Sequence, residues 1–353
     1  MKAIHGRGTA ENPPNRFEPL HVEKDEDFLD GEELAEFSPS TRFFKETARS
    51  IISRNDSPDV GLTATINPYR GCEHGCIYCY ARPTHEYLGF SSGLDFETKI
   101  IAKENAPELL RKELQRPQWK PQVLGMSGIT DCYQPLERRL QLTRRCLEVL
   151  AEFRNPVAVI TKNYLVTRDI DVLKKLAEFE CAVVFISITT LNADLQRVME
   201  PRAAHPRRRL EAIRQLAGAG IPVGVNVAPV VPGLTEHELP SIVGAAVEAG
   251  AAAAGYVVLR LPYSVAHLFE EWVTRHFPDR KDKILNRIRS IRGGKLNDPN
   301  FNSRMEGQGI YAREIAALFA LACKKSGIAE RENSGLSTRH FRRPAPGGQL
   351  EFL

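Results

Sequence analysis

Short apolar runs alternate with longer amphipathic stretches along the chain from residue 61 to about residue 262. The apolar runs are rich in Val and Ile, which is typical of buried strands, and the stretches between them carry apolar residues at helical spacing. The predicted strands are residues 61–67, 121–129, 155–162, 181–190, 221–231 and 253–262. The predicted helices are residues 104–115, 135–153, 167–179, 206–220 and 235–251.

This alternation indicates an α/β protein with a parallel sheet, because a helix between two strands brings the chain back to the same edge. About six strand–helix units suit either a partial (β/α)6 barrel of the TIM type or a doubly wound sheet. We expect Thr167 to be the N-cap of the helix 167–179. After the first strand the chain has a cysteine-containing loop where a dinucleotide-binding protein would have its glycine fingerprint.

The two ends of the chain differ from this central pattern. Residues 1–55 are polar, with several prolines and acidic residues, so we expect an N-terminal extension that is partly mobile. Within it, apolar residues of 41–53 lie near helical spacing, which predicts a short docked helix. Residues 56–265 are the predicted core, with the cysteine loop at 68–82. Residues 266–353 are predicted to be mostly helical, with a basic tail.

Composition narrows the class of protein. The 353 residues are 42% hydrophobic and 26% charged, with a net charge of +4, which is ordinary for a globular protein and too weakly basic to indicate nucleic-acid binding by itself. No run of 18 apolar residues occurs and the first residues lack an apolar segment, so we expect neither a transmembrane helix nor a secretory signal. Seven cysteines, an odd number, do not suit a disulfide framework in a chain of this length. A reducing cytoplasm fits best.

Three cysteines stand close together in "NPYRGCEHGCIYCYARP", residues 67–83: Cys72, Cys76 and Cys79. A structural zinc site needs four ligands, usually from paired CxxC units, and no second CxxC occurs. Zinc would require His74 or His85 as the fourth ligand. Three merely buried thiols do not suit a glycine-containing loop. A [4Fe–4S] cluster held by three thiolates keeps one iron open for a ligand, so the missing fourth cysteine favours a functional cluster.

The spacing Cys72-x3-Cys76-x2-Cys79, with Tyr78 before the third cysteine and a strand before the loop, resembles the motif of the radical S-adenosylmethionine (SAM) superfamily. The resemblance implies a partial (β/α)6 core and a [4Fe–4S] cluster whose open iron is chelated by SAM, with Tyr78 near the adenine. It also implies reductive cleavage of SAM to a 5′-deoxyadenosyl radical that abstracts hydrogen from a substrate. A flavodoxin or ferredoxin would donate the electron.

A narrower resemblance rests on the segments "NPYRGCEHGCIYCYARPTHEY", "DCYQPLE", "ITKN", "ISITTL" and "MEPRAAHPRRRLEAI". They are similar to the group related to spore photoproduct lyase, an enzyme that repairs a thymine dimer in DNA. This resemblance implies a lyase-like reaction on nucleic acid as one alternative for the function. An alternative from another class is a non-enzymatic iron–sulfur or zinc protein that binds nucleic acid.

Ligand-binding residues of a β/α barrel gather at the carboxyl ends of its strands. The polar residues at the predicted strand ends are Ser127, Thr130, Asp131, Thr161, Lys162, Ser187 to Thr190, Asn226 and Arg260. By the resemblance, the segment after the second strand meets the SAM amino group. The superfamily has Gly-Gly-Glu there and this chain has "GMSGITD", which leaves Thr130 and Asp131 as the candidates.

The other candidates each have two interpretations. The Lys162 ammonium pairs with the SAM carboxylate or with an internal carboxylate. Ser187 binds the ribose or carboxylate of SAM, or only packs in the sheet, and Asn226 bonds the cofactor or the backbone. Glu200 and Arg202 form a solvated pair in a loop, or contact SAM and substrate.

Cys132 follows Asp131 at the rim of the predicted site. In spore photoproduct lyase a cysteine near the end of the second strand donates a hydrogen atom to the product radical. The best-matching position here is Gly128, and Cys132 is displaced from it. Cys132 is therefore either a hydrogen donor or a buried, inert thiol.

Nucleic acid is a candidate partner because basic residues recur late in the chain, although solvated helix faces explain such runs equally well. These residues are Arg207 to Arg209, Arg287, Arg289, Arg292, Arg339, His340, Arg342 and Arg343.

Overall fold

A computed structural model describes residues 4–17, 40–330 and 335–345. Its largest sheet has eight strands in the order β11-β10-β9-β8-β7-β6-β3-β2. Every neighbouring pair is parallel except β2 with β3. The strands are β2 (Ile52–Arg54), β3 (Ala64–Ile66), β6 (Leu124–Met126), β7 (Val157–Thr161), β8 (Ala182–Ser187), β9 (Val223–Val230), β10 (Ala253–Val258) and β11 (Ala329–Glu330).

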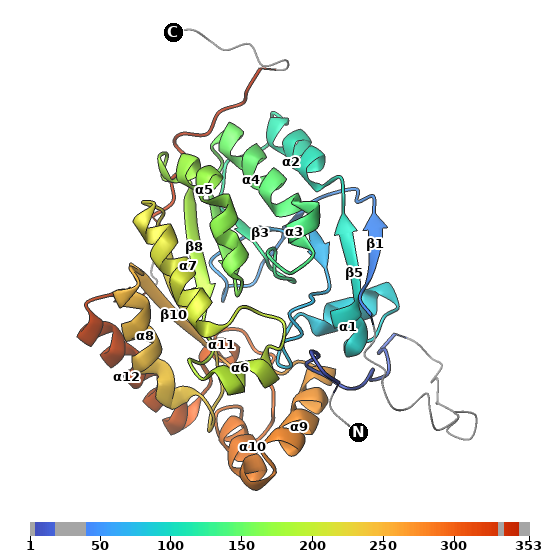
Figure 1. The fold of residues 1–353 in the computed structure, drawn as a ribbon, viewed down its shortest axis with the longest axis vertical. Helices are drawn as coiled ribbons and strands as arrows, with labels where there is room; N and C mark the ends of the chain where they lie inside the picture. Colours follow the sequence, from blue (N-terminus) through green and yellow to red (C-terminus); the bar gives the residue numbers. More distant parts are fainter. Residues whose placement is uncertain (1–3, 18–39, 331–334, 346–353) are drawn as a thin grey trace.

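The six strands from β3 to β10 are adjacent in chain order, so the strand order never reverses as it would in a doubly wound sheet. Helices follow the strands along one side of the sheet (Figure 1). They are α2 (Ala106–Gln115), α4 (Leu142–Phe153), α5 (Ile170–Ala177), α7 (Pro206–Gly218), α8 (Leu239–Glu248) and α12 (Gly309–Ser326). The expected partial (β/α)6 barrel is confirmed, and the doubly wound alternative is wrong.

The main core lies between this sheet and its helices. The strands β6, β7, β8 and β9 are mostly or fully buried, because Val and Ile side chains fill both faces of a parallel sheet, whereas β10 is only partly buried. Leu147 of α4, Val159 of β7 and Ile186 of β8 are completely buried in one apolar cluster. The apolar face of each helix supplies the other half of that cluster.

Two helix starts differ from the sequence-based expectation. The predicted helix 135–153 is divided into α3 (Glu137–Leu140) and α4, because Gln141 between them has φ +52°. Thr167 is not an N-cap, because it lies inside the 3-10 helix η3 (Tyr164–Asp169) and its hydroxyl donates to the Tyr164 carbonyl. Asn163 caps η3 and accepts from the Leu165 N–H at 3.0 Å.

The predicted helix over residues 41–53 is wrong. Residues 42–46 form β1 (Arg42–Glu46), which pairs in parallel with β5 (Lys99–Lys103), and β5 also pairs with β4 (Tyr69–Arg70). The local pattern was ambiguous, and the strand partner supplied by a distant part of the chain decided the conformation.

The described part of the N-terminal extension packs against the cysteine loop region. The N–H groups of Gly8 and Thr9 donate to the Glu97 carboxylate at 3.0 and 3.2 Å. Asn15 donates to the carbonyl of Glu86 at 2.9 Å. The 3-10 helix η2 (Arg82–Leu88) and α1 (Leu94–Thr98) carry these acceptors. The expected partial mobility of residues 1–55 stays a prediction, and residues 1–3 and 18–39 of this extension lie outside the described residues.

The C-terminal part is mostly helical, as the sequence indicates, and then returns to the sheet through β11. It also contains α9 (Ser264–His276), η5 (Pro278–Arg280), α10 (Lys281–Ser290) and α11 (Ser303–Glu306). The remaining elements are α6 (Ala193–Met199) and η4 (Glu236–Glu238). Among the described residues, no helix combines the length and apolar character needed to cross a membrane.

The basic tail docks at the end of the molecule away from α1, α6 and α9 (Figure 1). The Arg342 N–H donates to the Phe153 carbonyl at 2.9 Å, and the Arg343 guanidinium to the Trp119 carbonyl at 2.9 Å. Arg339 pairs with Glu180. The described part of the tail, residues 335–345, is therefore attached to the core by its cations and by the ring of Phe341, whose centroid lies 6.3 Å from that of Phe153.

Candidate active site at the cysteine loop

The cysteine loop joins β4 to η2 and is held by three separate parts of the chain. The Cys72 N–H donates to the Phe96 carbonyl at 2.9 Å, and the Ile77 N–H donates to the Met199 carbonyl at 3.0 Å. The buried Arg82 guanidinium donates to the Cys76 carbonyl at 3.0 Å. Because α1, α6 and η2 all contribute contacts, the loop conformation is fixed by tertiary structure.

The N-terminal segment also lies directly on this loop. A Cβ atom added to Gly8 would stand 1.8 Å from the Gly75 carbonyl oxygen, so only glycine permits this approach. Gly75 itself has φ +65°, and a Cβ there would lie 2.7 Å from the Glu97 carboxylate. Glu97 also pairs with Arg82 at 2.5 Å, and both side chains are completely buried. Glu97 therefore ties the N-terminal segment, the cysteine loop and η2 together.

The three cysteines are free thiols, with Cys72 and Cys76 buried and Cys79 partly exposed. Burial raises the pKa of all three thiols, so their thiolates need a nearby positive charge such as a bound metal. Among the described residues, no three His, Cys, Asp or Glu side chains converge as the ligands of one metal ion do. Three thiol donors within one loop suit a [4Fe–4S] cluster, in which each thiolate binds a different iron.

The two histidines considered as a fourth zinc ligand are engaged elsewhere. His74 faces Asp131 on one side and Asn163 on the other, with its Nε2 3.0 Å from the Asn163 side-chain nitrogen. His85 is buried, and its Nε2 lies 2.9 Å from the Lys99 carbonyl. The donor set of the loop therefore fits a three-cysteine cluster.

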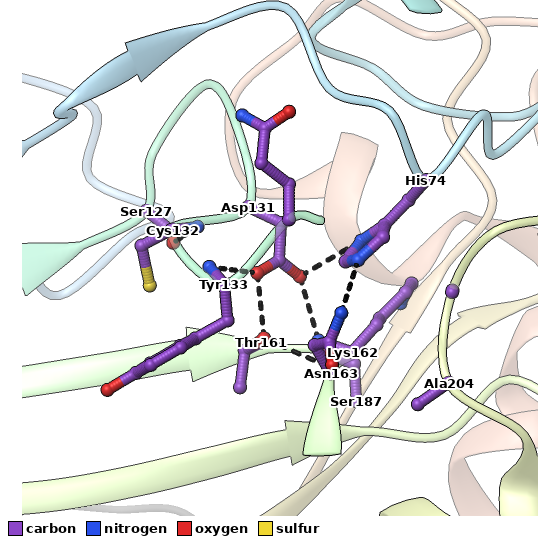
Figure 2. A network of polar contacts seen from close by, with 12 residues as sticks. His74, Ser127, Asp131, Cys132, Tyr133, Thr161, Lys162, Asn163, Ser187 and Ala204 are labelled. Carbon is purple, nitrogen blue, oxygen red and sulfur yellow. Dashed lines mark hydrogen bonds and ion pairs between the residues drawn. The ribbon is translucent and has the colours of Figure 1, made fainter. Parts of the chain in front are cut away.

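Asp131 joins the loop after β6 to the carboxyl end of β7 and to the cysteine loop (Figure 2). Its Oδ1 accepts from the Thr161 hydroxyl at 2.7 Å, and its Oδ2 accepts from the Lys162 N–H at 2.8 Å. The His74 Nδ1 lies 3.4 Å from Oδ2. Burial alone would raise the pKa of Asp131, but His74 and these hydrogen bonds lower it to about 2.

Thr130 makes a parallel connection. Its hydroxyl donates to the Gly71 carbonyl at 2.6 Å, and Gln134 donates to the same carbonyl at 3.2 Å. The two predicted partners of the SAM amino group, Thr130 and Asp131, thus both attach the loop after β6 to the cysteine loop. Their contact with SAM stays a prediction.

A second buried carboxylate, Glu200, lies on the other side of the cysteine loop. It forms a close ion pair with Arg209, and both side chains are essentially inaccessible to solvent. The Tyr78 hydroxyl donates to Glu200, and the Thr189 hydroxyl donates to it at 2.7 Å. Burial would raise the pKa of Glu200, but Arg209 and then Lys162 lower it to about 2.

This network corrects two expectations. Glu200 does not pair with Arg202 in a solvated loop, because Arg202 pairs with Glu73 at 3.2 Å. Arg209 does not belong to a solvated basic face, because it is completely buried. The segment "MEPRAAHPRRRLEAI" contains both members of the real pair, but nothing in its spacing shows that the chain folds Arg209 back onto Glu200.

An internal carboxylate, which the sequence analysis gave as one of two possible partners of the Lys162 ammonium, lies close to it in the structure. Its Nζ lies 3.8 Å from Glu200 and donates to the Ala228 carbonyl at 2.8 Å. The ammonium also lies 5.8 Å from the centroid of the Tyr78 ring. Lys162 and Tyr78 are therefore neighbours at the carboxyl ends of the strands.

Ser187, the last residue of β8, and Asn226, within β9, are brought together as sheet partners. Both side chains are buried, and the Ser187 carbonyl accepts from Arg209 at 3.0 Å. Figure 2 places Ser187 beside Lys162 and Thr161. Four of the predicted residues thus share one end of the sheet, as the strand-end rule indicates.

Cys132 directly follows Asp131, and its side chain belongs to the main apolar core. Its side chain is completely buried, and burial raises the pKa of its thiol well above the usual range. Its N–H donates to the Ser127 hydroxyl at 2.8 Å. This is the arrangement expected of an inert thiol, and a role as hydrogen donor stays an untested prediction.

The family model of the radical SAM superfamily matches residues 66–246. An uncharacterized protein of Mycobacterium tuberculosis is 34% identical over 244 residues, which cover 68% of this chain and 71% of that protein. An uncharacterized protein of Methanocaldococcus jannaschii is 27% identical over 227 residues, covering 64% and 81% respectively.

Among solved structures, spore photoproduct lyase complexed with dinucleoside spore photoproduct has a TM-score of 0.55 and 15% identity, covering 82% of both chains. A variant of that lyase with bound SAM (AdoMet) and the same compound has a TM-score of 0.56. At this identity the similarity shows the fold alone. The chain therefore belongs to the radical SAM superfamily, and it shares the fold of spore photoproduct lyase.

Proposed function

We propose that this chain is an enzyme that binds a [4Fe–4S] cluster through Cys72, Cys76 and Cys79 and binds SAM at the remaining iron. When bound, the cluster supplies one electron that cleaves SAM to methionine and a 5′-deoxyadenosyl radical, which abstracts hydrogen from the substrate. The proposal rests on one observation: three free thiols stand on one loop that is fixed at the carboxyl ends of a (β/α)6 sheet.

The neighbouring residues have roles that follow from their positions. The Lys162 ammonium has three donors. Among the described residues its one close acceptor is the Ala228 carbonyl, with Glu200 3.8 Å away, so it can also bind the SAM carboxylate. We assign the ribose to Ser187 and Asn226, which are sheet partners in β8 and β9. Tyr78, whose hydroxyl is anchored by Glu200, presents its ring to the adenine.

Asp131 and Glu200 act as positioning residues in this proposal. Glu200 is buried and the Asp131 side chain is 11% exposed. The polar contacts of each carboxylate join the cysteine loop region to a strand end, Asp131 through His74 and Glu200 through Tyr78. Fixed supports of this kind keep the cofactor and its ligand in one orientation and exclude water. The reducing electron would come from a partner protein, a flavodoxin or ferredoxin.

The test is anaerobic reconstitution with iron and sulfide, then reduction with dithionite in the presence of SAM and assay for 5′-deoxyadenosine. We expect the product from the natural chain and none from Cys76→Ala. The matched control is Cys146→Ala, which removes a buried thiol in α4 far along the chain from the loop.

Other outcomes separate the alternatives. A cluster that forms without any 5′-deoxyadenosine would favour a non-enzymatic iron–sulfur protein. Stoichiometric zinc with no cluster would refute the proposal.

A second candidate, a spore photoproduct lyase-like reaction on nucleic acid, is supported by the shared fold and by arginine–aromatic pairs near the cysteine loop. The basic residues that make nucleic acid a candidate partner give this second function little support. Arg209 and Arg292 are buried, and the tail arginines bond to the core.

A further inference from the structure

Arg260 lies beside the cysteine loop at the carboxyl end of β10. Its guanidinium carbon is 5.4 Å from the centroid of the Tyr80 ring, and Tyr80 directly follows Cys79 in the chain. The Tyr80 hydroxyl donates to the Gly128 carbonyl at 2.7 Å, which fixes the ring, while about half of the side chain remains exposed. A ligand that touches both groups would stand next to the proposed cluster.

Positive charge accumulates around Arg260 without matching negative charge. Burial and then the nearby Arg304 lower the pKa of Arg260, and burial together with Arg260 lowers the pKa of Arg292 to about 10. The carboxylates that act on this group are Asp59, which pairs with Arg304, and Asp298. Three guanidinium groups therefore face two carboxylates.

The guanidinium that is left without a strong acceptor is that of Arg260. Arg292 donates to the main-chain carbonyls of Val258 and Leu259, so it serves to fix the end of β10. Neither Arg260 nor Arg292 forms a salt bridge within the described part of the chain. Arg292 has these carbonyl acceptors, whereas the hydrogen bond of Arg260 goes to the weak acceptor Met305 Sδ at 3.5 Å. Its Nε is buried and has no partner among the described residues.

An unpaired buried donor on a charged group lowers stability unless a ligand satisfies it. A guanidinium presents its donors as a planar fork that matches the oxygen atoms of a phosphate or carboxylate. The excess of positive charge and the Nε without a hydrogen-bond partner thus both indicate that the ligand is an oxyanion.

A second exposed ring lies near the same cations. The guanidinium carbon of Arg304 is 4.4 Å from the centroid of the Phe301 ring, and about half of Phe301 is exposed. Half-exposed rings next to arginines are the surface that planar bases stack on, with the cations binding the phosphates. This combination favours a phosphate over a carboxylate.

We propose that Arg260, supported by Arg304, binds a phosphate group of the substrate and that the Tyr80 ring packs against the base attached to it. The ligand is thus a nucleotide, either free or within a nucleic-acid strand. This subsite deepens the proposed function and rests on it, because it would hold the substrate beside the three cysteines.

Binding to the reconstituted protein, measured anaerobically without reductant, tests the subsite. The probes are inorganic phosphate, thymidine monophosphate and a fluorescent single-stranded oligothymidylate. We expect Arg260→Gln to weaken binding about tenfold or more, because a charge-assisted pair is lost. Arg339→Gln, at the other end of the molecule, should bind as the natural chain does. Tighter binding of the oligonucleotide would identify a strand, and equal binding a free nucleotide.

Thermal unfolding separates this role from a structural one. If Arg260 serves to bind a ligand, the Arg260→Gln variant should unfold at the same temperature as the natural chain, or at a higher one, when no probe is present. A lower unfolding temperature, unchanged binding by Arg260→Gln, or no binding of any probe by the natural chain would each overturn the subsite. None of these results depends on SAM cleavage, so the 5′-deoxyadenosine assay can fail or succeed independently.

Discussion

Replacing Glu200 by Gln should destabilise this protein more than any exposed charge removal does. The substitution keeps the shape of the side chain but removes the negative charge that faces Arg209. Both side chains are about 1% exposed, so water cannot replace the missing charge. Tyr78 and Thr189 would also exchange a charged acceptor for a neutral one.

The magnitude can be obtained in two ways. Removing one partner of a buried ion pair typically costs about 3–5 kcal/mol of the free energy of unfolding. Independently, the pKa of Glu200 is lowered from 4.5 to about 2 in the folded chain, and 1.36 kcal/mol per pKa unit gives about 3 kcal/mol. Because the folded pKa is the lower one, this stability is present above pH 4.5 and is lost as the pH falls towards 2.

Urea unfolding at pH 7 measures the effect. The matched control is Glu211→Gln in α7, whose exposed pair with Arg214 is screened by solvent and should contribute little to the free energy of unfolding. The double variant Glu200→Gln/Arg209→Met removes both charges and should recover much of the lost stability. A loss below about 1 kcal/mol for Glu200→Gln, or no recovery in the double variant, would refute the reasoning.

Two further predictions concern the surroundings of the cysteine loop. Gly8→Ala should release the N-terminal segment, because its Cβ would stand 1.8 Å from the Gly75 carbonyl oxygen. The rate of proteolysis near the N-terminus should therefore increase. The control Gly61→Ala adds a Cβ with no atom within 4 Å and should leave that rate unchanged. Burial lowers the pKa of His85 to about 4, so its contribution to stability is complete above pH 6.5 and is lost as the pH falls from 6.5 to 4. Urea unfolding across this range should show a shallower pH dependence in His85→Gln, and an unaltered slope would contradict the assignment.

The sequence alone determined the elements that depend on local pattern. Val- and Ile-rich runs became buried parallel strands, and amphipathic stretches became the outer helices, because the periodicity of each segment matches the face it buries. The three cysteines were recognisable because the proposed cluster ligands lie within eight residues of one another. The strand-end rule, which follows from parallel topology, predicted that Lys162, Ser187 and Asn226 lie near one end of the sheet, and their role in binding SAM stays a prediction.

Only the tertiary structure decided which distant groups meet. Arg209 folds back onto Glu200, His74 reaches Asp131, and residues 42–46 find β5 as a strand partner. Each of these contacts depends on packing by segments that are far away in the chain. The local spacing of residues therefore cannot predict them. For the same reason Arg260 was only one polar residue at a strand end until packing placed it beside Tyr80 and Arg304 with its Nε unpaired.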